Sequence, residues 1–97
     1  MNITLSDSAI SDLKGIGEYY IKEDLPDVGQ SFIAAILARI ETLTDHPDIG
    51  RIVPEFSAEH IRELIHPPFR IVYLRDIDSI QIIRVWRSER LLVLPEN

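Results

Sequence analysis

The spacing of hydrophobic residues predicts two helices in the first half of the chain. One set recurs at intervals of three or four residues, and its members are Ile10, Leu13, Ile16 and Tyr20. A second set follows at intervals of four, four, four and three, and consists of Val28, Phe32, Ile36, Ile40 and Leu43. This periodicity is typical of the buried face of a helix. We therefore expect one helix that ends near residues 20–22 and a second that ends near residues 44–46.

Residues at the ends of these segments support the same boundaries. Ser6 is well placed to accept a backbone hydrogen bond at the start of the first helix. Pro26 is suited to the first position of the second helix, and Pro47 disfavours helix in the residue before it. Gly15 and Gly17 weaken the first helix, although they also permit close approach of another backbone. The short link between the two helices predicts a helical hairpin.

The remaining segments have the pattern of β-strands. Ile3 and Leu5 alternate with polar residues, which predicts a short first strand. The later segments rich in β-branched and aromatic residues are Ile61–Ile65, Phe69–Arg75 and Ile80–Arg87, the last two joined by residues 76–79. The order β-α-α-β-β-β predicts an α+β fold in one domain, 1–97, with an antiparallel sheet packed against a two-helix hairpin. The apolar run Leu91–Leu94 either extends the sheet or covers a neighbouring surface.

Composition and charge narrow the class of protein. The 97 residues include no cysteine and no apolar stretch of membrane-spanning length, and the N-terminus lacks the features of a signal peptide. We therefore expect a cytoplasmic protein without a membrane contact. The net charge is −6, with nine carboxylates against three basic residues in residues 1–50. Residues 51–97 hold seven carboxylates and seven arginines. The overall acidity argues against direct, specific nucleic-acid binding.

An ordered set of segments in the second half identifies a family resemblance. These segments are Gly50–Glu55, Ile61–Leu64, Phe69–Tyr73 and Ile82–Arg87, followed by Arg90. In order and spacing they resemble the RelE/ParE superfamily of toxins, and Asp12-Leu13, Ile16, Tyr19-Tyr20 and the helix from Pro26 extend the similarity more weakly into the first half. The resemblance implies the fold described above. It also implies a tightly bound antitoxin encoded in the same operon, with higher-order toxin–antitoxin assembly.

The superfamily has two functional branches. RelE-like members cut messenger RNA in the ribosome and use an arginine and a tyrosine near the C-terminus, whereas ParE-like members poison DNA gyrase. In this chain Ser88 and Leu94 stand at those arginine and tyrosine positions. The resemblance therefore favours a ParE-like toxin of a type II system that binds gyrase and is neutralised by its antitoxin. The alternatives are a ribosome-dependent endoribonuclease and a degenerate, non-toxic family member.

The candidate site residues fall into two groups. The candidates for target binding are Arg84, Trp86, Arg87 and Arg90. The candidates for antitoxin binding or for a structural role are Arg51, Arg62, Arg70, Phe32 and Ile36. For Arg62, Arg70 and Arg84, salt bridges to Glu63, Asp76 or other carboxylates are the alternative to partner contacts. Trp86 is either an interface anchor or a core residue.

The sequence shows no motif for catalysis or for a cofactor. His46, His60 and His66 lack the spacing of metal ligands and have no cysteine companions. There is no glycine-rich phosphate loop, no Ser-His-Asp pattern and no nucleophilic cysteine. We expect neither a metal nor a cofactor, and no catalytic residue is assigned.

Overall fold

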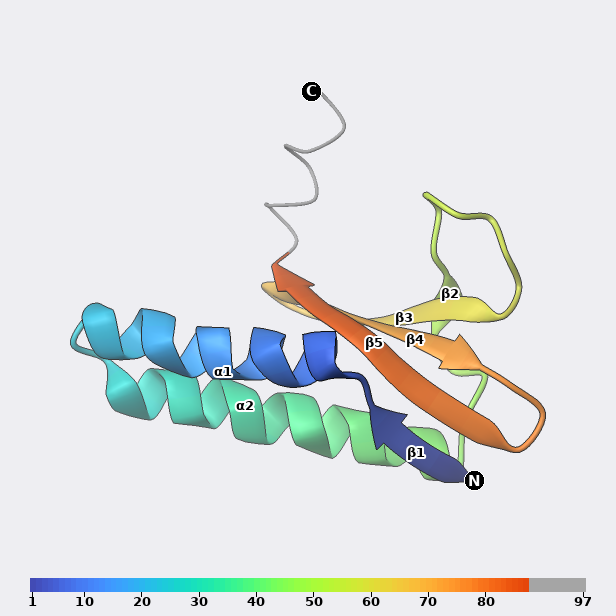
Figure 1. The fold of residues 1–97 in the computed structure, drawn as a ribbon, viewed down its shortest axis with the longest axis horizontal. Coiled ribbons are helices and arrows are strands. Elements are labelled where there is room, and N and C mark those ends of the chain that lie inside the picture. The colour runs from blue at the N-terminus through green and yellow to red at the C-terminus, as the bar shows by residue number, and fades with distance from the viewer. Residues whose placement is uncertain (88–97) are drawn as a thin grey trace.

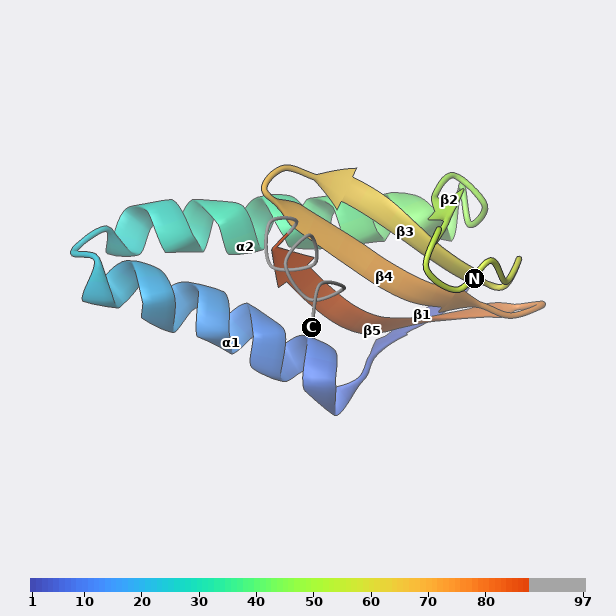
Figure 2. The same cartoon turned by 90° about the horizontal axis from the view of Figure 1, so that it is seen from above.

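Two helices cover one face of a five-stranded sheet (Figure 1). The computed structural model describes residues 1–87. In chain order the elements are β1 (Asn2–Leu5), α1 (Asp7–Lys22), α2 (Pro26–Glu41), the 3₁₀ turn η1 (Thr42–Thr44), β2 (Arg51–Ile52), β3 (Ile61–His66), β4 (Phe69–Arg75) and β5 (Ser79–Arg87). Seen from above, α1 and α2 lie side by side behind the sheet, and among the elements of residues 1–87 no helix lies on its other face (Figure 2). The predicted α+β fold is confirmed. Within residues 1–87, no helix is long and apolar enough to cross a membrane.

The helix ends agree with the signals in the sequence. The hydroxyl of Ser6 accepts a hydrogen bond from the backbone N–H of Ala9 at 3.1 Å, which satisfies one of the unpaired amides at the start of α1. Pro26 is the first residue of α2. The helical segment continues as η1 to Thr44, three residues before Pro47.

The sheet is mixed, so the prediction that it is antiparallel was wrong for one pair of strands. The strand order is β1-β5-β4-β3-β2, and β1 runs parallel to β5 while the other pairs are antiparallel. Alternation of Ile3 and Leu5 marks one face of a strand, but it carries no information about its neighbour or direction. The two-residue strand β2 is also too short to produce a periodic pattern.

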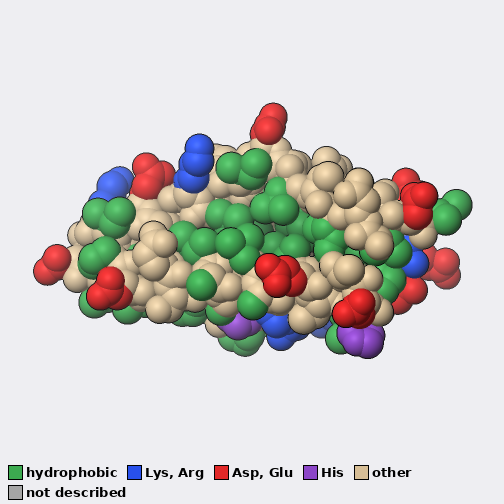
Figure 3. All heavy atoms as spheres, turned by 90° about the horizontal axis from the view of Figure 1, so that it is seen from below, with side chains coloured by type: hydrophobic (Ala, Val, Ile, Leu, Met, Phe, Trp, Pro, Cys, Tyr) green, Lys and Arg blue, Asp and Glu red, His purple; other side chains and the backbone are tan. Residues whose placement is uncertain are grey.

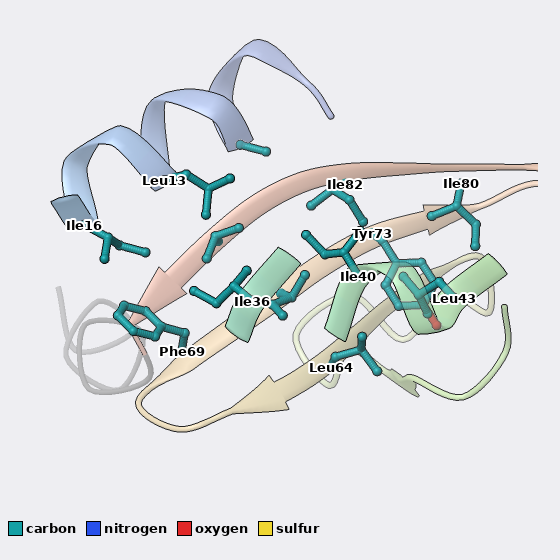
Figure 4. Close-up of a cluster of buried hydrophobic side chains, with 13 residues drawn as sticks. Leu13, Ile16, Ile36, Ile40, Leu43, Leu64, Phe69, Tyr73, Ile80 and Ile82 are labelled. Atoms are coloured by element: carbon teal, nitrogen blue, oxygen red, sulfur yellow. The ribbon is translucent and has the colours of Figure 1, made fainter. Parts of the chain in front are cut away.

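The core lies between the helices and the inner face of the sheet (Figure 4). The contributions of the helices are Ala9, Leu13, Ile16, Ile36 and Ile40, with Leu43 from η1. Those of the sheet are Leu64, Phe69, Ile71, Tyr73, Ile80, Ile82 and Val85. Removal of these apolar surfaces from water is the main force that holds the two layers together.

A bulge in β5 determines which of its side chains face the helices. Tyr73 pairs with Ile82 and Val72 pairs with Arg84, so Ile83 is an extra residue without an opposite partner. Ile82 and Val85 are consequently both buried in the core, although they are three residues apart. Beyond the bulge, Arg87 follows Val85 on the helix side, whereas Arg84 and Trp86 belong to the outer face.

Candidate functional site

A pocket of about 220 Å³ lies where the end of β5 meets α1. β1 pairs with β5 only as far as Ile82, so α1 flanks the edge of β5 beyond that residue. Gly15 faces open space there, since an added Cβ would meet no atom within 4 Å. The lining residues are Ser11, Asp12, Gly15, Ile16, Tyr19, Tyr20, Phe69, Val85, Trp86 and Arg87. We call this hollow the β5 pocket.

Asp12 holds one wall of the β5 pocket in place. Its Oδ2 accepts hydrogen bonds from the backbone N–H of Val85 and from Arg84 Nε, both at 2.8 Å. Its Oδ1 accepts a third from Arg84 at 3.0 Å. The hydrogen bonds to Asp12 raise the pKa of Arg84. The Arg84 guanidinium also lies 4.7 Å from the centre of the Trp86 ring, so that Asp12, Arg84 and Trp86 form one connected group.

Arg87 lies among aromatic rings on the opposite side of the strand. Its guanidinium carbon is 5.6 Å from the ring centre of Tyr19 and 5.5 Å from that of Phe69. It donates a hydrogen bond of 3.4 Å to the hydroxyl of Tyr20. Ring contacts continue from Tyr19 to Tyr20, Phe32 and Phe69, with centroid separations of 5.0 to 5.5 Å. We call these five residues the aromatic–arginine cluster.

The arrangement favours binding over proton transfer. Arginine, tryptophan and tyrosine supply large, rigid contact areas with polar tips, and they are enriched at protein interface hot spots. The only carboxylate that lines the β5 pocket, among the described residues, is Asp12, and its oxygens are occupied. The pocket therefore offers a recognition surface with a cation and aromatic faces.

Part of this site was recognisable in the sequence and part was missed. The structure places the predicted residues Trp86 and Arg87 in the lining of the β5 pocket, with Trp86 half-buried. Arg84 does not line the pocket but is bound to Asp12, which does. Arg90 lies outside the described residues, as do Ser88, Leu94 and the run from Leu91. The contributions of Asp12 and Tyr19 were not predicted. Their spacing of seven residues, which aligns them on one helix face, was the available signal.

Arg51 and Arg70 belong to a cluster of charges on the outer face of the sheet. The carboxylate of Glu63 accepts a hydrogen bond from Arg70 Nε at 2.5 Å and another from Arg51 Nε at 2.7 Å. Arg70 also donates two hydrogen bonds to Glu55, at 2.9 and 3.0 Å. We call these four residues the outer-face ion cluster. They lie together because Arg51 pairs with Glu63 across β2 and β3, and because Glu63 and Arg70 share a face.

The outer-face ion cluster attaches residues 53–60 to the sheet. The pKa of Glu55 is lowered, chiefly by its hydrogen bonds to Arg70, and those bonds raise the pKa of Arg70. Beside the cluster, Val53 and Val72 are almost fully buried. Salt bridges were the alternative to partner contacts for Arg62, Arg70 and Arg84, and all three form them: Arg70 with Glu63 and Glu55, Arg84 with Asp12, and Arg62 with Asp48 at 3.9 Å.

Arg62 and Tyr73 hold the turn before β2. Arg62 donates a hydrogen bond to the carbonyl of Gly50 at 2.9 Å. The Tyr73 hydroxyl accepts from the Gly50 N–H at 3.0 Å and donates to the Pro47 carbonyl at 2.9 Å. Burial raises the pKa of the Tyr73 phenol. Glycine is required at position 50 because a Cβ there would lie 2.6 Å from the Tyr73 oxygen.

Phe32 and Ile36 have different surroundings although both lie on α2. Ile36 is fully buried in the core. Phe32 is half-buried and lines a shallow groove of about 430 Å³, together with Asp27, Val28, Ser31, Ala35 and His66. We call this the α2 groove, and it is open to a partner. No grouping of histidine and carboxylate side chains that would hold a metal ion occurs within residues 1–87.

Comparisons with known proteins agree with this architecture. Residues 3–92 match the family model described as the ParE toxin of type II toxin–antitoxin system, parDE. Among solved structures, a chain of the chromosomal ParDE TA system from P. aeruginosa superposes with a TM-score of 0.75 at 22% sequence identity. The alignment covers 90% of this chain and 95% of that one, which shows a shared fold. A search of curated proteins found no match.

Proposed function

The chain belongs to the ParE toxin family of type II toxin–antitoxin systems, and from this premise we propose that it poisons DNA gyrase by binding it and is neutralised by an antitoxin. Gyrase as the target rests on the resemblance to the ParE-like branch. The observation that supports the mode of action is the convergence of Tyr19, Trp86 and Arg87 at the β5 pocket. These residue types dominate protein–protein recognition.

RNA cleavage is the alternative that this arrangement disfavours. Cleavage of a phosphodiester requires cations that stabilise the developing charge and a group that moves a proton. At the β5 pocket, the charge of Arg84 is neutralised by Asp12, and the Asp12 oxygens are in turn occupied. The net charge of −6 also opposes approach of RNA.

We place the antitoxin on the α2 groove, next to the proposed target site. Phe32 forms one wall of this groove and contacts the ring of Phe69, with centroids 5.2 Å apart. Phe69 in turn contacts Arg87. A segment of antitoxin bound along α2 would therefore end beside the aromatic–arginine cluster and exclude gyrase from it.

Substitution of Arg87 tests the proposed target contact. Arg87→Ala removes a half-buried cation from the β5 pocket, and truncation of a hot-spot arginine costs about 2–4 kcal/mol. We expect gyrase binding to weaken by about 30-fold to 1000-fold, with a matching loss of inhibition in a supercoiling assay with purified gyrase. Arg39→Ala on α2, which does not line the pocket, is the matched control and should change inhibition by less than about threefold.

Two further measurements keep the interpretation unambiguous. Thermal unfolding of both variants shows whether a loss of inhibition reflects a loss of fold. Sequencing of messenger ends after incubation with translating ribosomes tests the endoribonuclease alternative. Full activity of Arg87→Ala would exclude this residue as a target contact. A wild-type chain that leaves supercoiling unchanged would exclude gyrase as the target.

A further inference from the structure

A second surface, unrelated to the β5 pocket, lies on the face of the helical hairpin that points away from the sheet. It is a shallow groove of about 500 Å³ along the seam of the two helices. Figure 3 shows hydrophobic side chains gathered along this seam, with charged side chains on both sides. The lining residues are Ile10, Leu13, Lys14, Gly17, Glu18 and Ile21 of α1, with Gln30 and Ile33 of α2. We call it the seam groove.

The seam groove leaves large apolar side chains in water. Exposed fractions are 41% for Ile10 and 61% for Ile21, and Leu37 of α2, outside the groove lining, is 39% exposed. Residues 28–38 of α2 include no charged side chain, although only part of that helix faces the core. A helix that is apolar on more than its buried face is expected to pack against a further partner.

The order of side chains along α1 indicates which partner. Ile10, Lys14, Gly17, Glu18 and Ile21 lie on one face and read apolar, cation, small, anion, apolar. When a second α1 helix is laid antiparallel against the first, this order places an anion opposite each cation and an isoleucine opposite each isoleucine. A surface with this property is complementary to itself, as an interface with two-fold symmetry requires.

We propose that the seam groove binds a second copy of this chain, with the two α1 helices antiparallel about a two-fold axis near residue 16. In this register Ile10 of each copy lies opposite Ile21 of the other, and Lys14 lies opposite Glu18. Both pairs share nearly the same centre, although Ile10 and Ile21 are about 16 Å apart along the helix and Lys14 and Glu18 about 6 Å. Because the axis is two-fold, the Ile10–Ile21 contact and the Lys14–Glu18 contact each occur twice in the dimer.

Gly17 provides the space at the centre of this contact. It is buried between the helices, and a Cβ added there would lie 3.5 Å from Ile33 Cδ1. The absence of a side chain lowers the floor of the seam groove, so the aliphatic stem of Lys14 from the other copy can lie over it. Its ammonium group would then reach Glu18 beside that glycine.

The dimer leaves the proposed target site accessible in both copies. The seam groove uses residues 10, 13, 14, 17, 18 and 21 of α1, whereas the β5 pocket uses residues 11, 12, 15, 16, 19 and 20. These two sets lie on different sides of the helix. Self-association is therefore independent of whether gyrase is the target.

Charge reversal tests the two-fold contact directly. The full-length chain, free of antitoxin, is examined by sedimentation equilibrium, and we expect a mass of twice 11.1 kDa for the wild type. Lys14→Glu and Glu18→Lys each create two like-charge contacts per dimer, so each should weaken dimerisation by about 10-fold to 100-fold. The double variant K14E/E18K restores both pairs and should return to within about threefold of wild type.

The controls separate this contact from general effects of charge. Lys22→Glu and Glu23→Lys produce the same changes in net charge outside the seam groove, and they should leave the dimer unchanged. Ile21→Ser should also abolish the dimer without loss of the fold, because that side chain is mostly exposed. Thermal unfolding of each variant verifies the fold.

Three results would overturn the proposal. The first is a wild-type chain that stays monomeric up to the highest soluble concentration. The second is a double variant that remains as weak as the single variants, because only a symmetric partner restores both pairs. The third is an Ile21→Ser variant that weakens antitoxin binding and leaves the mass of the free chain unchanged, which would assign the seam groove to the antitoxin. The supercoiling assay, run on the same variants, reports separately on the gyrase proposal.

Discussion

Replacement of Glu63 by glutamine should destabilise the fold more than any change to the exposed charges around it. Glutamine keeps the size and shape of the side chain but removes its negative charge. Glu63 is fully buried and accepts hydrogen bonds from Arg70 and Arg51 through different oxygens. In the variant, one of those oxygens becomes an amide group that can only donate, so it faces a guanidinium with which it cannot bond.

The expected loss of stability follows from how deeply each of the two arginines that bind Glu63 is buried. Removal of one partner from a buried ion pair costs about 3–5 kcal/mol, but Arg70 keeps its two hydrogen bonds to Glu55, which favours the lower end of that range. Arg51 is 59% exposed, and exposed pairs contribute at most about 1 kcal/mol. We therefore expect the free energy of unfolding to fall by about 3–4 kcal/mol for Glu63→Gln and by less than about 1 kcal/mol for Arg51→Gln.

Urea unfolding monitored by circular dichroism measures both values, and Arg51→Gln is the matched control for loss of one hydrogen bond to the same carboxylate. The melting temperature of Glu63→Gln should fall by at least about 12 °C, since 1 kcal/mol shifts a domain of this size by about 4–8 °C. The reasoning fails if the two variants lose the same free energy. It also fails if Glu63→Gln loses less than about 1 kcal/mol.

Three other perturbations test separate parts of the fold. Asp12→Asn weakens the charged pair with Arg84, so the free energy of unfolding in urea should fall by about 1–2 kcal/mol and hydrogen exchange in α1 should become faster. Unchanged exchange would contradict the role of Asp12 as an anchor of α1. Gly50→Ala forces a Cβ to within 2.6 Å of the Tyr73 oxygen and should cost about 1–3 kcal/mol, whereas an unchanged melting temperature would show that the turn yields freely. Glu55 has a pKa below 4.5 in the fold, so its stabilising contribution is complete above pH 4.5 and is lost as the pH falls through the folded-state pKa. Hydrogen-exchange protection of residues 53–60, taken relative to the intrinsic exchange rate at each pH, should fall below pH 4.5, and Glu55→Gln should remove that dependence; because Glu55 is 43% exposed, the effect is small.

The candidate site shows how much of a binding surface is visible in a sequence. Arg84, Trp86 and Arg87 stood out because these large polar or aromatic residues follow the apolar run Ile80–Ile83 in the last strand. Their separate roles depend on the bulge at Ile83 and on a carboxylate from Asp12, which is 72 positions from Arg84. Neither a bulge nor a contact between residues so far apart in the sequence produces a periodic pattern, because both arise from the way α1 packs against β5.

The arginines of the outer face illustrate a related difficulty. Alternation along β4 separates Arg70 and Val72 from Phe69 and Ile71, but each set includes apolar side chains. The pattern alone therefore could not show which face the helices cover. The structure shows that Val72 is buried as well, on the outer face of the sheet, to which Glu55 of residues 53–60 is bound through Arg70. A loop that covers a second face has no regular signal of its own.

Local chemistry was sufficient for the helices, the three long strands and their order along the chain. A helix or strand repeats its burial every few residues, and Ser6 and the prolines act on neighbouring backbone groups, so these features can be read within short windows. The parallel direction of β1, the partner of each arginine and the β5 pocket depended on contacts between distant segments. Those contacts are selected by the free energy of the whole packed molecule, in which one strand direction or one ion pair prevails only because the surrounding layers leave room for it.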